Sequence, residues 1–417
     1  IRAFQRPLQI LGCLIWIRTA HLQQMAQHRT AVTGTGIVII ISTLFSSCVK
    51  FNKPETHTDI QTEPMKACWV SYLELNMSDK SETAFTSAVN EMLLNIKNCG
   101  LNTVFVHTIS HLDAYYKSNI LPMSKYICNA RGGTLDYDPL EIICDTAKKY
   151  DLQIHAWINP FRILQGSTDL SAFASDDIAV KMITSGDATV TDNGAYLIPS
   201  SPASQRLILD CIREIIENYD IDGVHFDDYF YPTTDENFDK TAYEKYKSET
   251  VNPLPLSDYR RAFVDSFVSA VYRTVKAYDE NLQFGISPQA DIEKNRNTFY
   301  ADIEKWCAND GFIDYIIPQI YFGFDCPLDD FKFENCLNTW LKINRKCEMY
   351  VGLGMYRSGE ISQYGNKSSD EWVQNCDVIA RQIEYLYSAG IKGFAIYSYT
   401  SLTTKTAECD NMKKVLI

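Results

Sequence analysis

Apolar runs of strand length alternate with longer segments in which apolar residues recur every three or four positions, from Lys66 to the end of the chain. The first pattern is typical of buried strands and the second of amphipathic helices. The strand-like runs are residues 67–71, 103–107, 153–157, 221–226, 282–286, 315–320, 350–353 and 393–397. Enough chain for a helix follows each run, so the pattern predicts eight strand-helix units that close into a (β/α)8 TIM barrel.

An open doubly wound α/β sheet is the competing architecture. That fold carries a glycine-rich phosphate-binding turn after its first strand, and none follows residues 67–71. Residues 402–417 supply a helix after the last strand and complete the eighth unit. We therefore expect a single barrel domain over residues 65–417, with long loops after the third strand (161–200) and the fourth (231–257).

Several predicted helices have recognisable first residues. Ser81 precedes an apolar series of helical period, while Asp138 and Ser201 each stand directly before a proline. Short polar side chains cap the free amides of a first helical turn, and proline fits its first position. These three positions predict helix starts.

One stretch, residues 221–232, runs from an apolar strand directly into two carboxylates and a cluster of aromatic rings. Side chains alternate between the faces of a strand, so Val224 and Phe226 share one face and His225 and Asp227 the other. We expect the apolar pair to pack against helices and the polar pair to face the barrel centre. The plainer interpretation is that the carboxylates only cap a following turn.

Carboxylates at a barrel mouth, among aromatic rings, fit glycoside hydrolysis, in which one acid protonates the departing oxygen and another acts as nucleophile or activates water. Asp227 is the first candidate catalyst. In a continuous strand Asp228 points the other way, so we expect it to orient Arg162 or a loop, or to serve as the acid if the strand has bent. Candidate partner acids come from other strand ends and are Glu74, Asp291 and, behind them, Glu360.

Aromatic and polar residues at the predicted strand ends are candidate substrate-binding residues, because flat rings stack on sugars and polar groups orient them. They are Trp69, His107, Trp157, Asn159, Arg162, His225, Tyr229, Gln319, Tyr321, Tyr356 and Tyr399.

A metal site is the rival interpretation of these strand ends, since His107, His225 and Asp227 are residue types that bind zinc. No His-x-His pair stands on one strand, and His155 lies deeper than the mouth, so a structural role suits it better. We expect no metal and no cofactor. The chain also lacks a Gly-x-Ser-x-Gly elbow and a phosphate-binding loop.

The composition of the chain limits the classes of partner that the protein is expected to bind. The chain has 417 residues, is 46% hydrophobic and carries a formal charge of -13 without a basic cluster in its body, which argues against nucleic acid. The 25 Tyr and 20 Phe suit a glycan ligand, and the 13 Cys form no Cys-x-x-Cys pair or regular framework. Nothing in the composition indicates an oligomeric state.

The first 64 residues differ from the rest. The apolar run 36–47 ends in small residues directly before Cys48, as in a bacterial lipoprotein signal whose cysteine becomes lipidated. We expect a leader over residues 1–47, with Met25 as a possible true start, and a lipidated Cys48 followed by a tether to residue 64. A lipid anchor predicts the cell envelope, on the periplasmic or outer-membrane face.

Five blocks of sequence together resemble the glycosyl-hydrolase-like family 10 of bacterial lipoproteins and secreted proteins. They are residues 67–74, 155–162, 222–232, 285–288 and 318–321. The resemblance implies a (β/α)8 barrel related to sugar-cleaving enzymes, some of which act on peptidoglycan glycan strands. It carries the strand-four aspartate onto Asp227 and the polar pair after strand three onto Asn159 and Arg162. The block after strand five departs from the family at residues 287–291.

We therefore expect a glycoside hydrolase that acts on a polysaccharide of the cell envelope, with the peptidoglycan glycan strand favoured, and with Asp227, Asp228 and Glu74 as catalytic candidates. Two alternatives stay open: a barrel that binds glycan without cleaving it, and a metal-dependent hydrolase built on His107, His225 and Asp227.

Overall fold

The computed structural model describes residues 63–361 and 370–416. The predicted leader with Met25, Cys48 and nearly all of the predicted tether lie outside the described residues. None of the helices in the described part of the chain is both long and apolar enough to cross a membrane.

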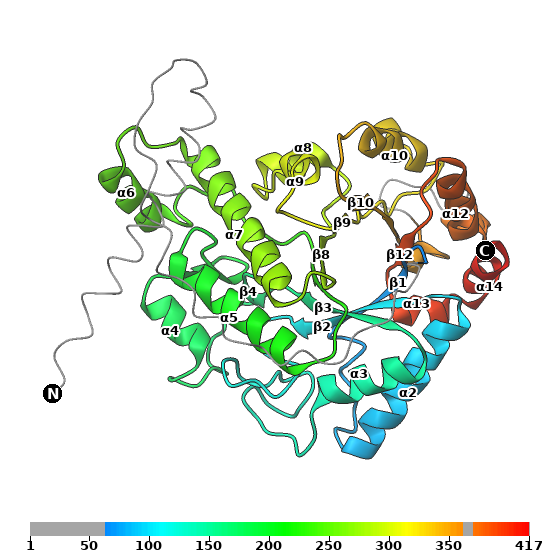
Figure 1. The fold of residues 1–417 in the computed structure, drawn as a ribbon, viewed down its shortest axis with the longest axis horizontal. Helices are drawn as coiled ribbons and strands as arrows, with labels where there is room; N and C mark the ends of the chain where they lie inside the picture. The colour runs from blue at the N-terminus through cyan, green and yellow to red at the C-terminus, as the bar shows by residue number, and fades with distance from the viewer. Residues whose placement is uncertain (1–62, 362–369, 417) are drawn as a thin grey trace, which may run out of the picture. The chain divides into compact units, whose positions relative to one another are not determined.

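A parallel sheet wraps into a barrel at the centre of Figure 1. Its strands in chain order are β1 (Lys66–Val70), β2 (Thr103–Ile109), β3 (Gln153–Ile158), β7 (Gly223–Phe226), β8 (Gln283–Ile286), β9 (Tyr315–Ile316), β10 (Glu348–Met349), β11 (Val351–Leu353) and β12 (Phe394–Ile396). Neighbours along the sheet follow the order β10-β9-β8-β7-β3-β2-β1-β12-β11.

The two ends of that order are parts of one chain segment, because only Tyr350 separates β10 from β11. Tyr350 donates its amide to the Ile316 carbonyl at 3.0 Å, and Gly352 donates to Pro318 at 2.9 Å. On its other side β11 pairs with β12. The segment therefore closes the barrel as its seventh strand, and the predicted (β/α)8 fold is confirmed.

Helices surround the strands (Figure 1). They are α2 (Glu82–Asn98), α3 (Pro139–Lys149), α5 (Pro202–Asn218), α7 (Leu256–Tyr278), α8 (Ile292–Asn297), α9 (Ile303–Ala308), α10 (Phe333–Leu341), α11 (Glu371–Gln374), α12 (Val378–Ser388), α13 (Tyr399–Thr404) and α14 (Thr406–Val415), with 3-10 turns η1 (Asp329–Phe331) and η2 (Met355–Arg357). The three predicted starts are confirmed, since Ser81, Asp138 and Ser201 each cap a helix with their side chains.

Strand parity separates two layers of core. One face of each strand packs against the helices, as Val224 and Phe226 do in the large apolar cluster. The other face fills the barrel interior with Trp69, Phe105 and Tyr315. Space there is tight, because a Cβ on Gly285 would lie 2.1 Å from the Tyr315 ring. The interior is a packed floor beneath the mouth.

The loops that follow β3 and β7 are long, as predicted, and carry structure of their own. After β3 come β4 (Arg162–Gln165), α4 (Ile178–Thr184), β5 (Ala188–Thr191) and β6 (Gly194–Leu197), with the three strands forming a small antiparallel sheet. After β7 comes α6 (Lys240–Glu249). A third long loop, residues 110–138 after β2, was not singled out by the sequence pattern.

Candidate active site

The stretch 221–232 delivers its polar residues to the barrel mouth as parity predicts. His225 lies in the interior, where its ring stacks on Phe105 at 4.1 Å between centroids, and Asp227 follows on the same side. For Asp228 the structure shows the second of the two cases considered, a strand that has already bent. Strand β7 ends at Phe226, so the chain has already turned and Asp228 reaches the same cavity as Asp227.

That cavity has a volume of about 470 Å³, within the usual range for a small-ligand site. Its walls come from β1, from β3 and from the segments that follow β7, β8, β9, β11 and β12. The lining residues are Trp69, Trp157, Asp227, Asp228, Tyr229, Ser287, Gln289, Ala290, Asp291, Lys294, Gln319, Tyr321, Phe322, Phe331, Tyr356, Arg357 and Tyr397. Carboxylates, amides and aromatic rings therefore share one pocket.

Asp227 is buried and accepts hydrogen bonds on both carboxylate oxygens. Its Oδ2 accepts from the Asn159 side-chain amide and from Trp157 Nε1 at 3.3 Å. Its Oδ1 accepts from the Tyr229 backbone amide at 3.2 Å. These donors come from the end of β3 and from the turn after β7, and they fix the orientation of the carboxyl group.

Asn159 connects Asp227 to two more of the predicted site residues. Its Oδ1 contacts His107 Nε2 at 2.5 Å and accepts from Arg162 at 3.1 Å. His107 Nδ1 accepts from the Tyr72 amide at 3.1 Å, so its proton is on Nε2 and is donated to Asn159. The Asn159 amide is thereby held with its NH2 group toward Asp227.

Asp228 has a different set of partners. Its Oδ2 accepts from Gln289 Nε2 at 2.7 Å and its Oδ1 from Gln319 Nε2 at 3.4 Å. Arg162 instead donates to the Ser110 carbonyl, to Gln165 and to Asn159. Of the two partners expected for Asp228, Arg162 or a loop, Asp228 contacts the loop segments that follow β8 and β9 and does not contact Arg162.

Burial and mutual repulsion shift the titration of this pair. Burial, followed by the Asp228 charge, raises the pKa of Asp227 from 3.8 to about 7, against the opposing effect of Arg162. Burial also raises the pKa of Asp228, although the Gln289 amide opposes it. Because the charge of Asp228 disfavours ionisation of Asp227, Asp227 is protonated in a large fraction of the molecules at neutral pH.

The histidines are engaged with protein partners. His225 Nε2 accepts from Trp69 Nε1 at 3.2 Å, and its Nδ1 contacts the Tyr315 hydroxyl at 3.1 Å. Tyr315 also contacts His155, which lies in the barrel floor as expected. Burial lowers the pKa of His107 and His225 well below the usual range, so both are neutral. Residues 63–361 and 370–416 contain no group of three metal-binding side chains arranged around a common point.

Glu74 is displaced from its predicted role. Its carboxylate accepts from the Ser71 amide and hydroxyl, the Ser398 hydroxyl, and the amide and hydroxyl of Thr400. It does not line the cavity. Glu74 therefore fastens the segment after β1 to the segment after β12, and its assignment as the second acid is corrected.

Two further assignments change. Tyr399 begins α13, and its hydroxyl accepts from Asn95 of α2 at 3.2 Å, so the prediction that it faces substrate is wrong. Glu360 is exposed and pairs with Lys405 at 3.4 Å. Asp291, by contrast, lines the cavity while it caps α8 through the Lys294 amide.

Tyr397 and Lys294 line the cavity and were missed. Parity identifies the first: Phe394 and Ile396 of β12 face the helices, Ala395 faces the interior, and Tyr397 continues on the inner side. Burial, with the charges of Glu74 and Asp227, raises the pKa of Tyr397 to about 12. No sequence signal marks Lys294, because it stands on a short helix after β8.

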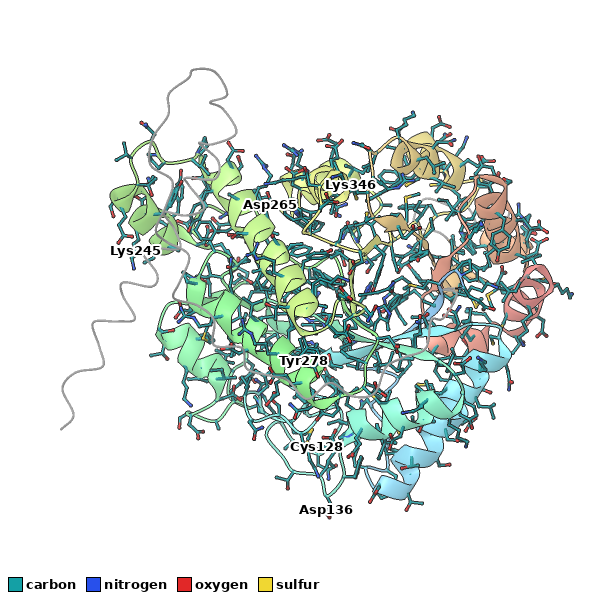
Figure 2. The ribbon with its side chains drawn as sticks, in the orientation of Figure 1. Cys128, Asp136, Lys245, Asp265, Tyr278 and Lys346 are labelled. Carbon is teal, nitrogen blue, oxygen red and sulfur yellow. The ribbon has the colours of Figure 1, made fainter. Side chains whose placement is uncertain are left out.

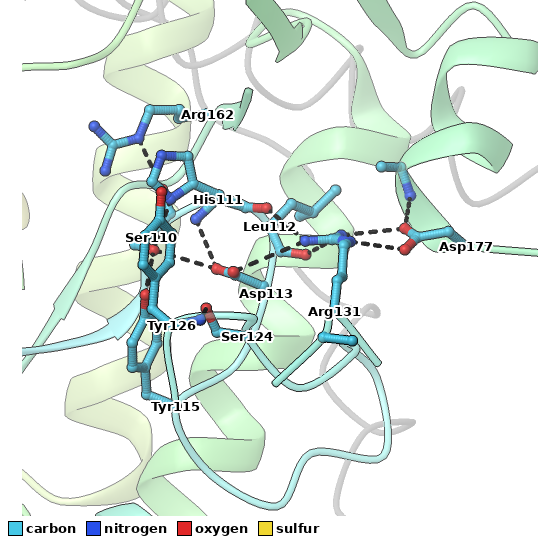
Figure 3. A network of polar contacts seen from close by, with 12 residues as sticks. Ser110, His111, Leu112, Asp113, Tyr115, Ser124, Tyr126, Arg131, Arg162 and Asp177 are labelled. Carbon is cyan, nitrogen blue, oxygen red and sulfur yellow. Dashed lines mark hydrogen bonds and ion pairs between the residues drawn. The ribbon is translucent and has the colours of Figure 1, made fainter. Parts of the chain in front are cut away.

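Figure 3 shows a buried polar network behind Arg162. Arg131 contacts Asp177 through two hydrogen bonds of 2.7 and 3.1 Å and donates to the backbone carbonyls of His111 and Leu112. Asp113 accepts from the His111 amide at 2.8 Å. The network holds the loop after β2 in place. In that loop the Ser110 carbonyl accepts a hydrogen bond from Arg162.

Comparison with known proteins places this geometry in a family. The family model for glycosyl hydrolase-like 10 matches residues 64–374. The chain belongs to the glycosyl hydrolase-like 10 family. The resemblance inferred from five sequence blocks is thereby confirmed.

Two proteins similar to the chain are named as glycosyl hydrolases. The chain is 31% identical over 344 residues to glycosyl hydrolase YngK of Bacillus subtilis, a match that covers 77% of this chain and 66%, just under two thirds, of YngK. It is 27% identical over 396 residues to glycosyl hydrolase DigH of Escherichia coli O6:H1, covering 84% of this chain and 88% of DigH.

A solved structure shares the fold at much lower identity. The PgaB (BpsB) glycoside hydrolase domain of Bordetella bronchiseptica aligns with a TM-score of 0.57 and 11% identity, over 85% of this chain and 99% of that domain. This likeness concerns the barrel and says nothing of the bond that is cleaved.

Proposed function

We propose that the protein is a glycoside hydrolase of a cell-envelope polysaccharide, with the peptidoglycan glycan strand as the favoured substrate. The observation that carries the proposal is the coupled pair Asp227 and Asp228, buried together in a cavity walled by aromatic rings. The family and the names of its relatives support the same reaction class.

In this proposal Asp227 is the general acid. A carboxyl whose pKa is about 7 is protonated in about half of the molecules at pH 7, and the protonated form can transfer its proton to a departing glycosidic oxygen. Its proton faces the cavity because the Asn159, Trp157 and Tyr229 donors occupy its other acceptor positions.

Asp228 is the ionised partner. Its two glutamine amides stabilise a negative charge without neutralising it, and that charge stabilises the positive charge that develops on the sugar ring in the transition state. Asp291, in the same cavity, is the candidate to activate water. Tyr229, which is 40% exposed, offers a ring for sugar stacking.

A barrel that binds glycan without cleaving it is the second candidate. Such a protein has no need for two buried carboxyls with raised pKa values, and burying them is costly. The metal-dependent alternative has less support, since both ring nitrogens of His107 and of His225 contact protein groups.

The test is release of reducing ends from a panel of purified glycans, including peptidoglycan glycan strands, by wild type and Asp227→Asn. Asp265→Asn is the matched control, because Asp265 is a buried aspartate on α7 bonded to Lys305 and Trp306 (Figure 2). We expect cleavage by wild type and by the control only. Binding of a glycan without cleavage at any pH would establish the second candidate instead.

The location is part of the proposal. We infer from residues 36–48 that Cys48 is lipidated and anchors the barrel to a bacterial envelope membrane. Growth with a radiolabelled fatty acid should label the wild type and not Cys48→Ala. Equal labelling of both proteins would refute the anchor without bearing on the barrel.

A further inference from the structure

Two cationic side chains line the cavity on the side that follows β8 and β11. They are Lys294 of α8 and Arg357 at the end of η2. Among the described residues, no carboxylate oxygen lies within 4.0 Å of either side-chain cation. Two other arginines with buried side chains do have carboxylate partners: Arg131 pairs with Asp177, and Arg260 pairs with Asp239.

Arg357 is held in place by a ring rather than by an acid. Its guanidinium lies over the Tyr356 ring at 4.9 Å from the centroid. Its Nε is buried and makes no hydrogen bond to any described residue. The residue as a whole is only half-buried and lines the cavity, so the other guanidinium nitrogens can donate to a ligand there.

Lys294 acts on the same space electrostatically. Lys294 and Asp228 line the same cavity, and the Lys294 charge opposes the burial that raises the pKa of Asp228, although no ion pair joins the two. The chain as a whole carries a formal charge of -13 and repels anions. Two cations without acidic partners at the cavity wall therefore favour an anionic group on the ligand.

The anion that a guanidinium fork and a nearby ammonium bind in a glycan is a carboxylate. Two kinds of sugar acid provide one: a uronic acid, whose carboxylate is part of the sugar, and muramic acid, whose carboxylate is on a lactyl ether. We propose that Arg357 and Lys294 bind a free carboxylate on a sugar beside the cleaved bond, so that the substrate is an acidic glycan. This inference rests on the proposed function and specifies its substrate class.

The experiment compares each glycan with its carboxyl-reduced form, in which every carboxylate is converted to an alcohol. One pair is peptidoglycan glycan strand freed of its peptides, and the other is a uronic-acid polysaccharide. For wild type we expect kcat/KM to fall at least about tenfold on reduction of the pair that contains the true substrate. The pair that responds identifies the source of the carboxylate.

Variants test the two cations separately. Arg357→Gln should cleave the acidic and reduced forms equally, Lys294→Gln should lose part of the discrimination, and Arg357→Lys should keep part of it. Lys245→Gln removes the same charge from α6, away from the barrel (Figure 2), and should discriminate like wild type.

The outcomes separate this inference from the proposed function. Equal cleavage of acidic and reduced glycans by wild type would overturn the carboxylate site and leave the hydrolase standing. A preference that survives in Arg357→Gln would also overturn it. If no glycan is cleaved, the proposed function fails. The carboxylate site is then tested by affinity: wild type should bind the acidic form of a glycan more tightly than its reduced form, and Arg357→Gln should bind both equally.

Discussion

The side-chain amide of Asn159 donates a hydrogen bond to Oδ2 of Asp227, joining the end of β3 to the end of β7. The same side chain accepts from His107 and Arg162. The Asn159 amide thus connects Asp227 to His107 and Arg162. The two donors to its oxygen fix its orientation, so that its NH2 group points toward Asp227. The proton chemistry of Asp227 depends on this contact.

Replacement of Asn159 by alanine tests the contact. The change removes a donor to the ionised form of Asp227, so the pKa of Asp227 should rise further. We expect kcat to fall about 100-fold and the alkaline limb of the pH profile to move to higher pH. Asn90→Ala, on the surface of α2, is the control. An unchanged profile in Asn159→Ala would show that the amide does not act on Asp227.

Asp228→Asn tests the coupling between the two carboxyls. The charge of Asp228 raises the pKa of Asp227, so its removal should lower that pKa. The alkaline limb of kcat/KM against pH should then move to lower pH, opposite to the shift in Asn159→Ala. Loss of activity with no displacement of the limb would contradict the coupling.

Stability should depend on pH through Asp227. Because its pKa is raised from 3.8 to about 7 in the folded protein, the folded state binds the proton more tightly than the unfolded state. The contribution of Asp227 to stability is therefore greatest below pH 4 and falls as pH rises to 7, by about 1.4 kcal/mol for each unit of the shift. The variant Asp227→Asn should lack this pH dependence, because asparagine does not titrate.

Thermal unfolding at pH 4, 6 and 8 measures this effect. The Tm of Asp227→Asn relative to wild type should increase from pH 4 to pH 8. A relative Tm that is constant with pH, or that falls, would mean that Asp227 is ionised throughout.

The network in Figure 3 predicts a cost in stability. Arg131→Met leaves the buried Asp177 carboxylate without its guanidinium, which should cost about 3–5 kcal/mol of unfolding free energy. The double variant Arg131→Met with Asp177→Asn should recover part of that loss. Denaturant unfolding measures both. A loss below about 1 kcal/mol, as for exposed ion pairs, would show that the network does not support the loop.

Much of the barrel and part of the site follow from periodicity. Alternation along 221–226 places His225 and Asp227 inward, because side-chain direction in a strand is a local property. The same rule applied to β12 places Tyr397 inward, whereas Tyr399 has the same parity but lies in α13, beyond the end of the strand. Local reasoning succeeds as long as the chain remains a strand.

Open alternatives and errors arise where the strand has ended. Asp228 reaches the cavity because β7 stops at Phe226, and the sequence does not show where a short strand turns. Glu74 has the right position along the chain, but donors from Ser398 and Thr400, more than 300 residues away, take up its carboxylate. Such contacts depend on the closure of the barrel and are not visible in any one segment.

The most direct test of the account is the rate at which Asp227→Asn releases reducing ends from a peptidoglycan glycan strand that wild type cleaves. The protein must first be shown to be folded by its circular dichroism and its unfolding transition. We predict that kcat falls at least about 1000-fold while affinity for the glycan is retained. Activity within about threefold of wild type in the folded variant would contradict the assignment of Asp227 as the acid.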